Sequence, residues 1–346
     1  MDIAQLLESS VKQKASDLHL SPGLSPIFRI NGELTPATDI PPLSADDMKT
    51  LIYSVMSTDQ QKEFETTLEL DFSVVIPKVA GFRVNAFHQI HGVAAVFRVI
   101  PEVIPTLEEL DLPPVFKRLL DLPNGLILVT GPTGSGKSTT LAAMVDHINR
   151  EQAEHIITIE DPIEFTHQSK KCLINQRQIH RDTHDFAAAL RSALREDPDV
   201  ILLGEMRDLE TIRLALTAAE TGHLVMATLH TSSAPRTISR IVDVFSSGEK
   251  NIIRNMLSES LQAVICQTLL KNTSGGRVPA FEIMLGTPAI RNLIREDKIA
   301  QMVTSIQTGG DIGMCTLDQY LQTLVAKQAI TQETARAVAT QKELFP

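Results

Sequence analysis

The strongest chemical signal in the sequence is a glycine-rich segment that follows a short apolar run. Residues 131–138 fit the pattern G-x-x-x-x-G-K-[ST]. Residues 126–129 predict a buried parallel strand before the segment, and residues from 139 onward predict a helix after it. In that context, backbone N–H groups and the positive end of a helix surround a phosphate. The segment therefore predicts a nucleoside triphosphate site rather than a chance glycine turn.

The side chains of this loop indicate how the ligand is held. The ammonium of Lys137 can reach the β- and γ-phosphates, and the hydroxyl of Ser138 can bind Mg²⁺. We therefore expect the triphosphate to be bound together with a magnesium ion. The predicted nucleotide-binding residues are Gly131, Pro132, Thr133, Gly134, Ser135, Gly136, Lys137, Ser138 and Thr139.

Hydrolysis of a triphosphate also requires carboxylates near the metal ion and near the attacking water. Two acidic clusters, in residues 157–164 and 197–208, accompany predicted strands. The carboxyl ends of parallel strands face the ligand crevice, so both clusters can reach the phosphates. We expect Glu205 in the site because it follows an apolar strand and a glycine. Glu160 and Asp199 could instead be ordinary solvent-exposed residues at the ends of strands.

Histidines and arginines near these clusters are further candidates. His223 and His230 flank another apolar strand. We expect His230 to sense the γ-phosphate or to position water, although a structural role is open. Their spacing supports zinc only weakly, because residues seven apart on a strand point to opposite faces. Arg191 and Arg195 are four apart in a predicted helix over 186–196 and would share one face, which could also be a plain solvated face.

Composition narrows the class of protein. The 346 residues include 32 Lys and Arg against 42 Asp and Glu, a formal net charge of −10, which argues against nonspecific nucleic-acid binding. The three cysteines are far apart and contain no C-x-x-C pair, which favours reduced thiols in a cytosolic protein without a thiolate zinc site. The sequence shows no signal peptide, and no apolar run approaches the ~20 residues of a membrane-spanning helix. Membrane association is therefore expected only through a partner.

The hydrophobic pattern divides the chain into two parts. Residues 1–99 predict a small α+β domain with a helix near 44–66. Residues 100–114 predict a proline-stiffened linker. Residues 115–346 predict an α/β domain with a parallel sheet, because strands and helices alternate there. The strands expected in the first domain are 17–20, 27–30, 70–76, 81–87 and 93–99, and those in the second are 126–130, 155–160, 200–204 and 223–229.

The end of the second domain is expected to be mostly helical from about residue 249 onward. A well-marked helix is also expected earlier, from Asp208 to Thr221, with Gly222 just past its end. The helices expected in the C-terminal region are 249–262, 287–296, 316–327 and 331–341.

Taken together, these motifs resemble those of the secretion-type motor ATPase superfamily. Besides the glycine loop, or Walker A motif, its members have an Asp box (here 159–164), a Walker B box (202–208) and a His box (223–230). Residues 16–20 and 29–32 are similar to the PAS-like N-terminal domain of these motors. Residues 289–296 match the C-terminal signature of the PilT-type type IV pilus retraction ATPases, although from composition alone they could form an ordinary helix with a charged face.

The resemblance implies an α/β fold in which a PAS-like domain precedes a RecA-like P-loop ATPase domain. It implies a homohexamer that hydrolyses ATP with Mg²⁺ and couples hydrolysis to domain rotation and pilus retraction. The protein would be cytoplasmic, at the cytoplasmic face of the inner membrane. Its expected partners are an inner-membrane pilus platform protein and an accessory retraction ATPase. Neither nucleic-acid binding nor direct membrane insertion is expected.

The resemblance also assigns roles to residues. Glu164 is implied as the base for the attacking water, and Glu205 as a ligand of Mg²⁺ through water, whereas the residues alone leave these two roles interchangeable. Arg83 and Arg98 are implied to reach the γ-phosphate from the N-terminal domain, although they could otherwise be ordinary exposed strand residues. Arg191 and Arg195 are implied to contribute from the ATPase domain. The nucleotide would lie between the two domains and be completed by a neighbouring subunit.

Alternative functions lie inside and outside this superfamily. Extension and type II secretion ATPases are longer, and most contain a tetracysteine zinc insertion that is absent here. An accessory, PilU-type retraction ATPase is disfavoured by the intact 289–296 signature. A small-molecule or nucleotide kinase seldom combines the glycine loop with an Asp box and a His box. A catalytically silent ring component is disfavoured by intact Lys137, Glu164 and Glu205. DNA translocation is disfavoured by the acidic composition.

Overall fold

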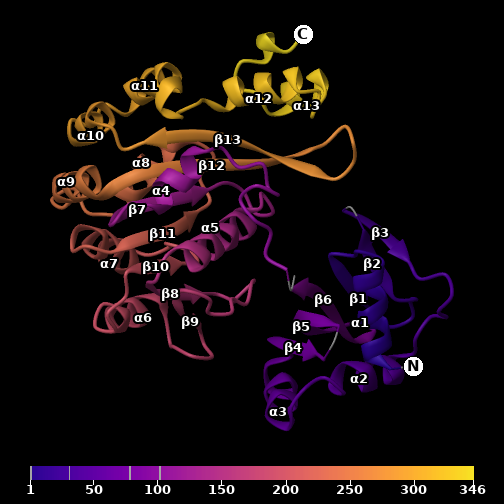
Figure 1. Cartoon of the computed structure of the whole chain (residues 1–346). Helices are drawn as coiled ribbons and strands as arrows, with labels where there is room; N and C mark the ends of the chain where they lie inside the picture. Colours follow the sequence, from indigo (N-terminus) through magenta and orange to yellow (C-terminus); the bar gives the residue numbers. More distant parts are fainter. Residues whose placement is uncertain (1, 31, 78, 101–102) are drawn as a thin grey trace. The chain divides into compact units, whose positions relative to one another are not determined.

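The computed structural model describes residues 2–30, 32–77, 79–100 and 103–346. The chain divides into two compact units, Met1–Val103 and Ile104–Pro346, which are described separately (Figure 1). The boundary falls within the predicted linker over 100–114. Ile100 belongs to the last strand of the first unit, and residues 101–102 of the linker lie outside the described residues.

The first unit contains a six-stranded antiparallel sheet with strand order β3-β2-β1-β6-β5-β4. Its core includes Leu6, Phe64, Phe82 and Phe97, all of them fully or almost fully buried. The elements are α1 (Ile3–Lys12), β1 (Asp17–Leu20), β2 (Ile27–Ile30), β3 (Glu33–Pro36), α2 (Ala45–Tyr53), α3 (Thr58–Thr67), β4 (Glu69–Ile76), β5 (Ala80–Gln89) and β6 (Gly92–Ile100).

The five strands expected in this unit are confirmed, but the single helix over 44–66 is wrong. Two helices, α2 and α3, occupy that region. The side chain of Ser57 accepts a hydrogen bond from the backbone N–H of Gln60, whose side chain accepts one from the backbone N–H of Ser57. This reciprocal pair starts a new helix at residue 58. The short edge strand β3 was not predicted, since its four residues are all exposed.

The second unit contains a seven-stranded sheet with strand order β13-β12-β7-β11-β10-β8-β9. All its pairings are parallel except that of β12 with β13. Its elements are α4 (Val115–Leu120), β7 (Gly125–Thr130), α5 (Lys137–Glu151), β8 (His155–Glu160), β9 (Leu173–Gln178), α6 (Phe186–Ala193), β10 (Val200–Leu203), α7 (Leu209–Glu220), β11 (Leu224–Leu229), α8 (Ala234–Asp243), α9 (Lys250–Ser260), β12 (Leu261–Lys271), β13 (Arg277–Leu285), α10 (Pro288–Arg295), α11 (Met302–Thr308), α12 (Leu317–Ala326), α13 (Gln332–Val338) and the 3₁₀ turns η1 (Ile299–Gln301), η2 (Gly310–Ile312) and η3 (Lys342–Leu344).

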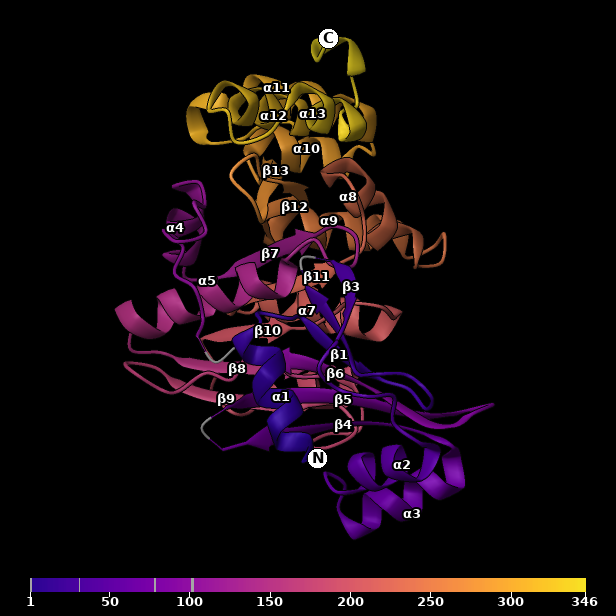
Figure 2. The same cartoon turned by 90° about the vertical axis from the view of Figure 1, so that its right-hand side faces the viewer.

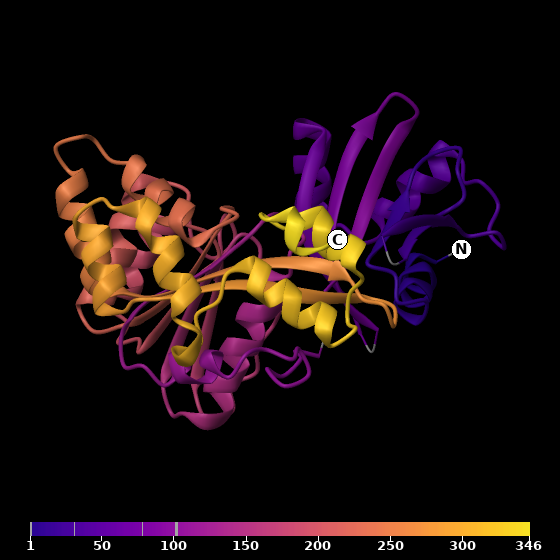
Figure 3. The same ribbon diagram turned by 90° about the horizontal axis from the view of Figure 1, so that it is seen from above.

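Helices cover both faces of this sheet, so its central strands are apolar throughout. Along β7, Leu126 and Leu128 pack into one core, whereas Ile127 and Val129 pack into the other. Alternate residues of one strand thus face opposite helical layers, as a parallel sheet requires. Figure 2 shows α10–α13 beyond β13, at one end of the strand order, and Figure 3 shows α12 and α13 beside the β12–β13 hairpin.

The expectation of a mostly helical region from about residue 249 is only partly right. Helices α9, α10, α12 and α13 match the four expected ones, but residues 261–285 form β12 and β13. A buried apolar run such as β12 has no periodicity that separates a strand from a buried helix. Strand β9 was also missed, and α6 ends at Ala193, so Arg195 is not on its helical face. No helix in the described ranges has both the length and the apolar character needed to cross a bilayer.

Candidate nucleotide-binding site

The glycine loop joins β7 to α5, as the sequence predicted. Gly131, Gly134 and Gly136 all have positive φ angles, and Gly136 is the N-cap residue of α5. A Cβ atom on Gly131 would lie 2.2 Å from the backbone oxygen of Gln267 in β12. Only glycine fits this position, because the loop passes so close to the neighbouring strand.

Lys137 is the first residue of α5 and is largely buried. Its Nζ donates hydrogen bonds to the carbonyl oxygens of Gly131, at 2.9 Å, and Pro132, at 3.0 Å. Burial lowers the pKa of Lys137, and the charges of Glu205 and Glu164 oppose that shift. Both predicted carboxylates therefore act electrostatically on Lys137.

Glu205 and His230 follow adjacent parallel strands, β10 and β11, and meet at their carboxyl ends. His230 Nε2 lies 3.0 Å from Glu205 Oε1, and Arg207 Nη2 lies 2.7 Å from Glu205 Oε2. Burial would raise the pKa of the Glu205 carboxyl, but Arg207 and His230 outweigh it and lower this pKa overall. An ionised carboxylate at this point suits a magnesium site. His223 lies at the other end of β11, where its Nδ1 contacts the carbonyl oxygen of Ala218 at 2.9 Å, which is a structural contact.

The side chains near the loop fit a hard cation that is bound together with phosphates. Ser138 lines a small cavity together with Glu160, Gly204 and Thr228, and with apolar residues that include Leu141 and Phe165. Across the described ranges, no three His, Cys, Asp or Glu side chains form a metal-binding group. Magnesium in nucleotide sites keeps several waters and takes one or two protein oxygens beside the phosphates. Ser138 and Glu205 can supply oxygens of this kind.

The Asp box contains one half-buried and one exposed glutamate. Glu160 is half-buried and accepts hydrogen bonds from Thr158 Oγ1 at 2.6 Å and from Gln176 Nε2 at 3.3 Å. It is therefore not the solvated strand-end residue that the sequence left open. Glu164 is exposed. Asp199 precedes β10 and accepts a hydrogen bond from the backbone N–H of His155, which places it at the amino end of the strand, opposite to Glu205.

The two arginines expected from the ATPase domain are not equivalent. Arg191 lies on α6, forms an ion pair with Glu210 and lines a hollow that Asp161 and Arg207 also line. Arg195 is exposed and lies past the end of α6. The two side chains therefore do not share one helical face, which corrects the expectation from their spacing.

Arg83 and Arg98 face each other across β5 and β6 in the first unit. Arg98 Nε lies 2.8 Å from Asp17 Oδ1, and Arg83 Nη2 lies 3.8 Å from Asp71 Oδ1. Together with Asn85, these side chains line a hollow on one face of the sheet. The guanidinium groups are partly exposed, with 38% of the Arg83 side chain and 65% of the Arg98 side chain accessible. They are thus available to an anion.

Two glutamines near the site were missed by sequence reasoning. Gln267, buried in β12, accepts a hydrogen bond from Thr140 Oγ1 of α5 at 2.8 Å. Gln176 of β9 contacts the loop after the Asp box. Both lie on strands that the pattern did not reveal. A polar amide inside an otherwise apolar run is the one signal that could have drawn attention to Gln267.

The chain matches known proteins over nearly its whole length. The family model for "Type II/IV secretion system protein" matches residues 1–307. The type IV pilus retraction ATPase PilT of Pseudomonas aeruginosa is 63% identical over 345 residues, covering 100% of both chains. A twitching motility protein of Neisseria gonorrhoeae is 55% identical, covering 99% of this chain and 91% of that one. The type IV pilus ATPase PilU of P. aeruginosa is 38% identical, covering 98% and 89%.

Solved structures agree with these sequence relatives. A crystal structure of the pilus retraction motor PilT with bound ADP superposes with a TM-score of 0.92 at 46% identity, covering 99% of this chain and 98% of that one. The Legionella pneumophila ATPase DotB superposes with a TM-score of 0.86 at 27% identity, covering 96% and 94%.

Proposed function

Because the chain belongs to the type II/IV secretion system protein family and is one of its pilus retraction ATPases, we propose that it hydrolyses ATP with Mg²⁺ to withdraw pilin subunits from a type IV pilus. The observation that supports this most directly is the full-length similarity to retraction ATPases, in a chain whose glycine loop has a lysine on which the charges of Glu205 and Glu164 act. The residues of the site then have distinct tasks.

The glycine loop and Lys137 bind the β- and γ-phosphates. To do so, the Lys137 ammonium exchanges the carbonyl oxygens of Gly131 and Pro132 for phosphate oxygens. Ser138 and Glu205 would hold the magnesium ion, with Glu205 acting through water. When bound, the ion neutralises charge that develops on the phosphate oxygens. His230 contacts the Glu205 carboxylate and therefore responds to whatever that carboxylate binds.

Glu164 accepts a proton from the attacking water, and the arginines balance negative charge on the transferred phosphoryl group. We assign this second task chiefly to Arg83 and Arg98, with a contribution from Arg191 and Arg195. Arginines in this role accelerate phosphoryl transfer by roughly 10³–10⁵-fold in other nucleotide hydrolases. The partial exposure of Arg83 and Arg98 is compatible with an incoming phosphate.

The working assembly in this proposal is a cytoplasmic homohexamer at the inner membrane. It acts on a pilus platform protein in that membrane and is joined by an accessory ATPase. The similarity to PilU of P. aeruginosa supports the existence of such paired ATPases. Association with the membrane would go through the platform protein rather than through a helix of this chain.

The decisive experiment uses a strain whose sole copy of the gene encodes the Lys137→Ala variant. Counting surface pili and measuring twitching should reveal abundant pili and no movement, because extension continues while retraction stops. Bald cells would instead identify an extension motor. Normal pili with normal movement would contradict any motor role in pilus dynamics. Phosphate release by the purified parent and variant proteins, without an added acceptor, separates a hydrolase from a kinase.

A further inference from the structure

The loop between β8 and β9 contains Glu164 and is fixed to its surroundings on both sides of that residue. Among the described residues, no hydrogen bond or ion pair engages the Glu164 carboxylate itself. The position of this carboxylate therefore depends on how the loop backbone is fixed. The inference drawn below rests on the proposed role of Glu164 as the base for the attacking water.

Gln176 of β9 contacts this loop with both ends of its amide. Its Nε2 donates to the carbonyl oxygen of Phe165 at 2.9 Å, and its Oε1 accepts from the backbone N–H of His167 at 2.7 Å. The same Nε2 also donates to Glu160 Oε1 at 3.3 Å. One side chain thus fixes the residues directly after Glu164 and also binds the first glutamate of the Asp box.

Glu160 fixes the other end of this contact. Its half-buried carboxylate accepts hydrogen bonds from Thr158 and from Gln176, while burial raises its pKa. In the parallel pairing of β8 with β9, Thr158 is the direct neighbour of Gln176. Gln176 therefore holds the loop backbone at Phe165 and His167, directly after Glu164, and is itself hydrogen-bonded to Glu160 at the start of the same loop.

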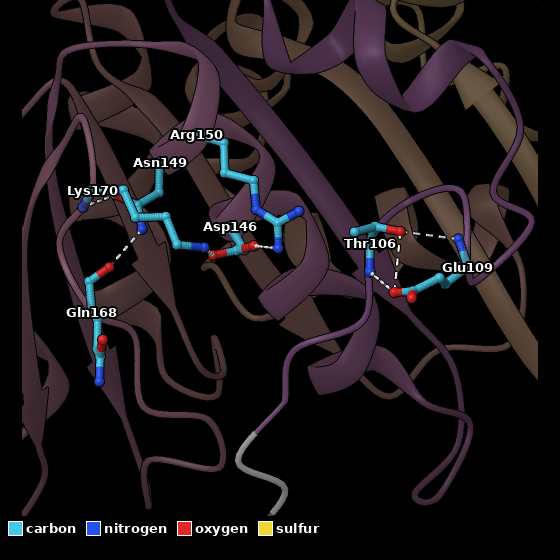
Figure 4. A network of polar contacts seen from close by, with 7 residues as sticks. All are labelled: Thr106, Glu109, Asp146, Asn149, Arg150, Gln168 and Lys170. Carbon is cyan, nitrogen blue, oxygen red and sulfur yellow. Dashed lines mark hydrogen bonds and ion pairs between the residues drawn. The ribbon is translucent and has the colours of Figure 1, made fainter.

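The downstream part of the loop is tied to α5, the helix that begins with Lys137 (Figure 4). Asn149 Nδ2 donates to the carbonyl oxygen of Gln168 at 2.8 Å, and Asn149 Oδ1 accepts from the backbone N–H of Lys170 at 2.9 Å. The buried Asp146 binds the ammonium of Lys170 and also pairs with Arg150. These contacts hold the loop at a fixed position relative to α5, the helix that begins with Lys137.

We propose that Gln176 is a positioning residue for hydrolysis, which acts with Glu160 to hold Glu164 at the attacking water. Loss of its two hydrogen bonds to the loop frees the backbone on the carboxyl side of Glu164 and leaves the glycine loop unchanged. Displacement of a catalytic group by about 1 Å can cost on the order of 10²-fold in rate. The defect belongs to the chemical step and spares nucleotide binding.

The test is a double-mutant cycle in the full-length protein with Gln176→Met and Glu164→Gln. Methionine keeps the length of the side chain and removes both hydrogen-bonding groups, so folding is preserved better than with alanine; melting temperatures verify this. We expect Gln176→Met to lower kcat about tenfold or more with KM for ATP within about twofold. In the Glu164→Gln background, the same change should cost less than about twofold.

Asn175→Ala provides a matched control, because Asn175 is adjacent in β9 but contacts His155 instead of the loop. Its kcat should equal that of the parent. The inference would be overturned if Gln176→Met had an effect of equal size in the parent and in the Glu164→Gln background, or if it raised KM in parallel. Either result would give Gln176 a structural role and would leave Glu164 as the proposed base. If Glu164→Gln alone leaves kcat unchanged, the proposed base and the positioning role fall together.

Discussion

Lys137 illustrates how a single residue prepares this site for its ligand. A buried ammonium is costly unless hydrogen-bonded, and here two carbonyl oxygens of its own loop satisfy it. Phosphate oxygens can replace them without leaving the ammonium unpaired, because the loop glycines present their N–H groups to the same ligand. The charges of Glu205 and Glu164 help to keep the lysine protonated despite its burial.

For Glu205, we predict that Glu205→Gln lowers ATP turnover by at least about 10²-fold, the size of effect seen when a preorganised electrostatic group is removed. Glutamine keeps the shape of the side chain but loses the charge that pairs with Arg207 and His230 and that, in our proposal, attracts Mg²⁺. Phosphate release measured across a Mg²⁺ titration should show an increased magnesium requirement. The control is Asp199→Asn at the opposite end of β10, which should match the parent. Equal activity of both variants would remove Glu205 from the metal site.

His167 gives a prediction about stability and pH. Burial lowers its pKa to about 4, with Asp146 opposing this shift and Lys170 adding to it. The unfolded chain takes up a proton near pH 6.5, and the folded chain does so only near pH 4. The free energy of unfolding therefore falls as the pH falls between these values. Between pH 7 and pH 5, the parent should lose roughly 1–2 kcal/mol more than His167→Met does.

Urea unfolding at the two pH values measures this difference. The control is His184→Met, because His184 is exposed and its substitution should leave the pH dependence of the parent intact. Identical pH dependence in the parent and in His167→Met would show that the imidazole is not held neutral by the fold.

At the residue scale, the sequence predicted the site residues that belong to recognisable motifs. It missed the residues that reach the site only through contacts between segments that are distant in the sequence. The glycine loop and the Glu205–His230 pair follow from spacing, because parallel strands end at one edge of the sheet. Gln176 and Gln267 bind the site through hydrogen bonds to distant segments, and no local pattern indicates such contacts. The roles of Arg83, Arg98, Arg191, Arg195 and Glu164 stay predictions.

Helix α10 lies in the retraction signature and has both buried and exposed residues. A substitution that tests function should be made at an exposed residue, because changing a buried one also lowers stability. Ile290 is fully buried in the core, and Arg291 donates to the carbonyl oxygens of Gly286 and Ser258. Truncation of a buried isoleucine to alanine costs about 2–5 kcal/mol, so Ile290→Ala would lower the stability of the fold. Asn292 is exposed on the same helix and can be changed without that cost.

We therefore predict that Asn292→Ala leaves ATPase activity and melting temperature unchanged but impairs retraction in cells. Surface substitutions of this kind usually change stability by less than about 0.5 kcal/mol. Ile290→Ala is the matched variant, and it should lower the melting temperature as well as activity. Normal twitching by the Asn292→Ala strain would show that this position of α10 has no separate role in retraction.

Strand β12 lies beside the glycine loop and helps to position it. Gln267 accepts a hydrogen bond from Thr140 and closely approaches Gly131 and Gly136. We predict that Gln267→Ala raises KM for ATP several-fold and lowers stability by about 1–3 kcal/mol, since Thr140 is left unsatisfied in a buried place. Thr268→Ala, the next residue on β12, is the control. Nucleotide titration and thermal unfolding give both quantities; a parent-like KM would exclude this positioning role.

At the element scale, amphipathic helices and strands with clear turns were predictable, whereas three strands of the second sheet were not. In β9 the residues are largely polar, and in β12 they are buried on both faces. Neither pattern has the alternation by which a half-buried strand is identified. Because β12 and β9 contain Gln267 and Gln176, the missed strands account for the missed site residues.

The whole molecule combines two units with separate hydrophobic cores. The glycine loop lies in one unit, and Arg83 and Arg98 lie in the other. We predict that residues 104–346, expressed alone, bind ATP but turn it over at least about 10²-fold more slowly than the full chain, because the proposed arginines are missing. Full-length Arg83→Ala/Arg98→Ala is the control and should show a similar loss. Parent-like turnover by residues 104–346 would contradict this assignment.

At this scale, composition and the change of pattern near residue 100 predicted a two-part α/β protein, and the full-length relatives agree with that fold. An acidic chain with one glycine loop is compatible with many triphosphatases, however. Pilus retraction followed only from the combined resemblance of several motifs, because no single residue type is diagnostic of what a motor moves.

The β12–β13 hairpin has a mechanical consequence. Gln267, at the glycine loop, is about six residues from the turn that joins the strands, which is roughly 20 Å at ~3.3 Å per residue. Leu270 and Ala280 on this arm pack against Leu321 and Leu324 of α12. If the hairpin moves as a rigid body about Gln267, a tilt of about 5° displaces its tip by roughly 2 Å. Helix α12 contacts this arm within about three residues of Gln267, since Ala280 pairs with Thr268, so the same tilt moves that contact by only about 1 Å or less. The tip of the hairpin, rather than α12, therefore makes the larger movement when the strand tilts beside the glycine loop.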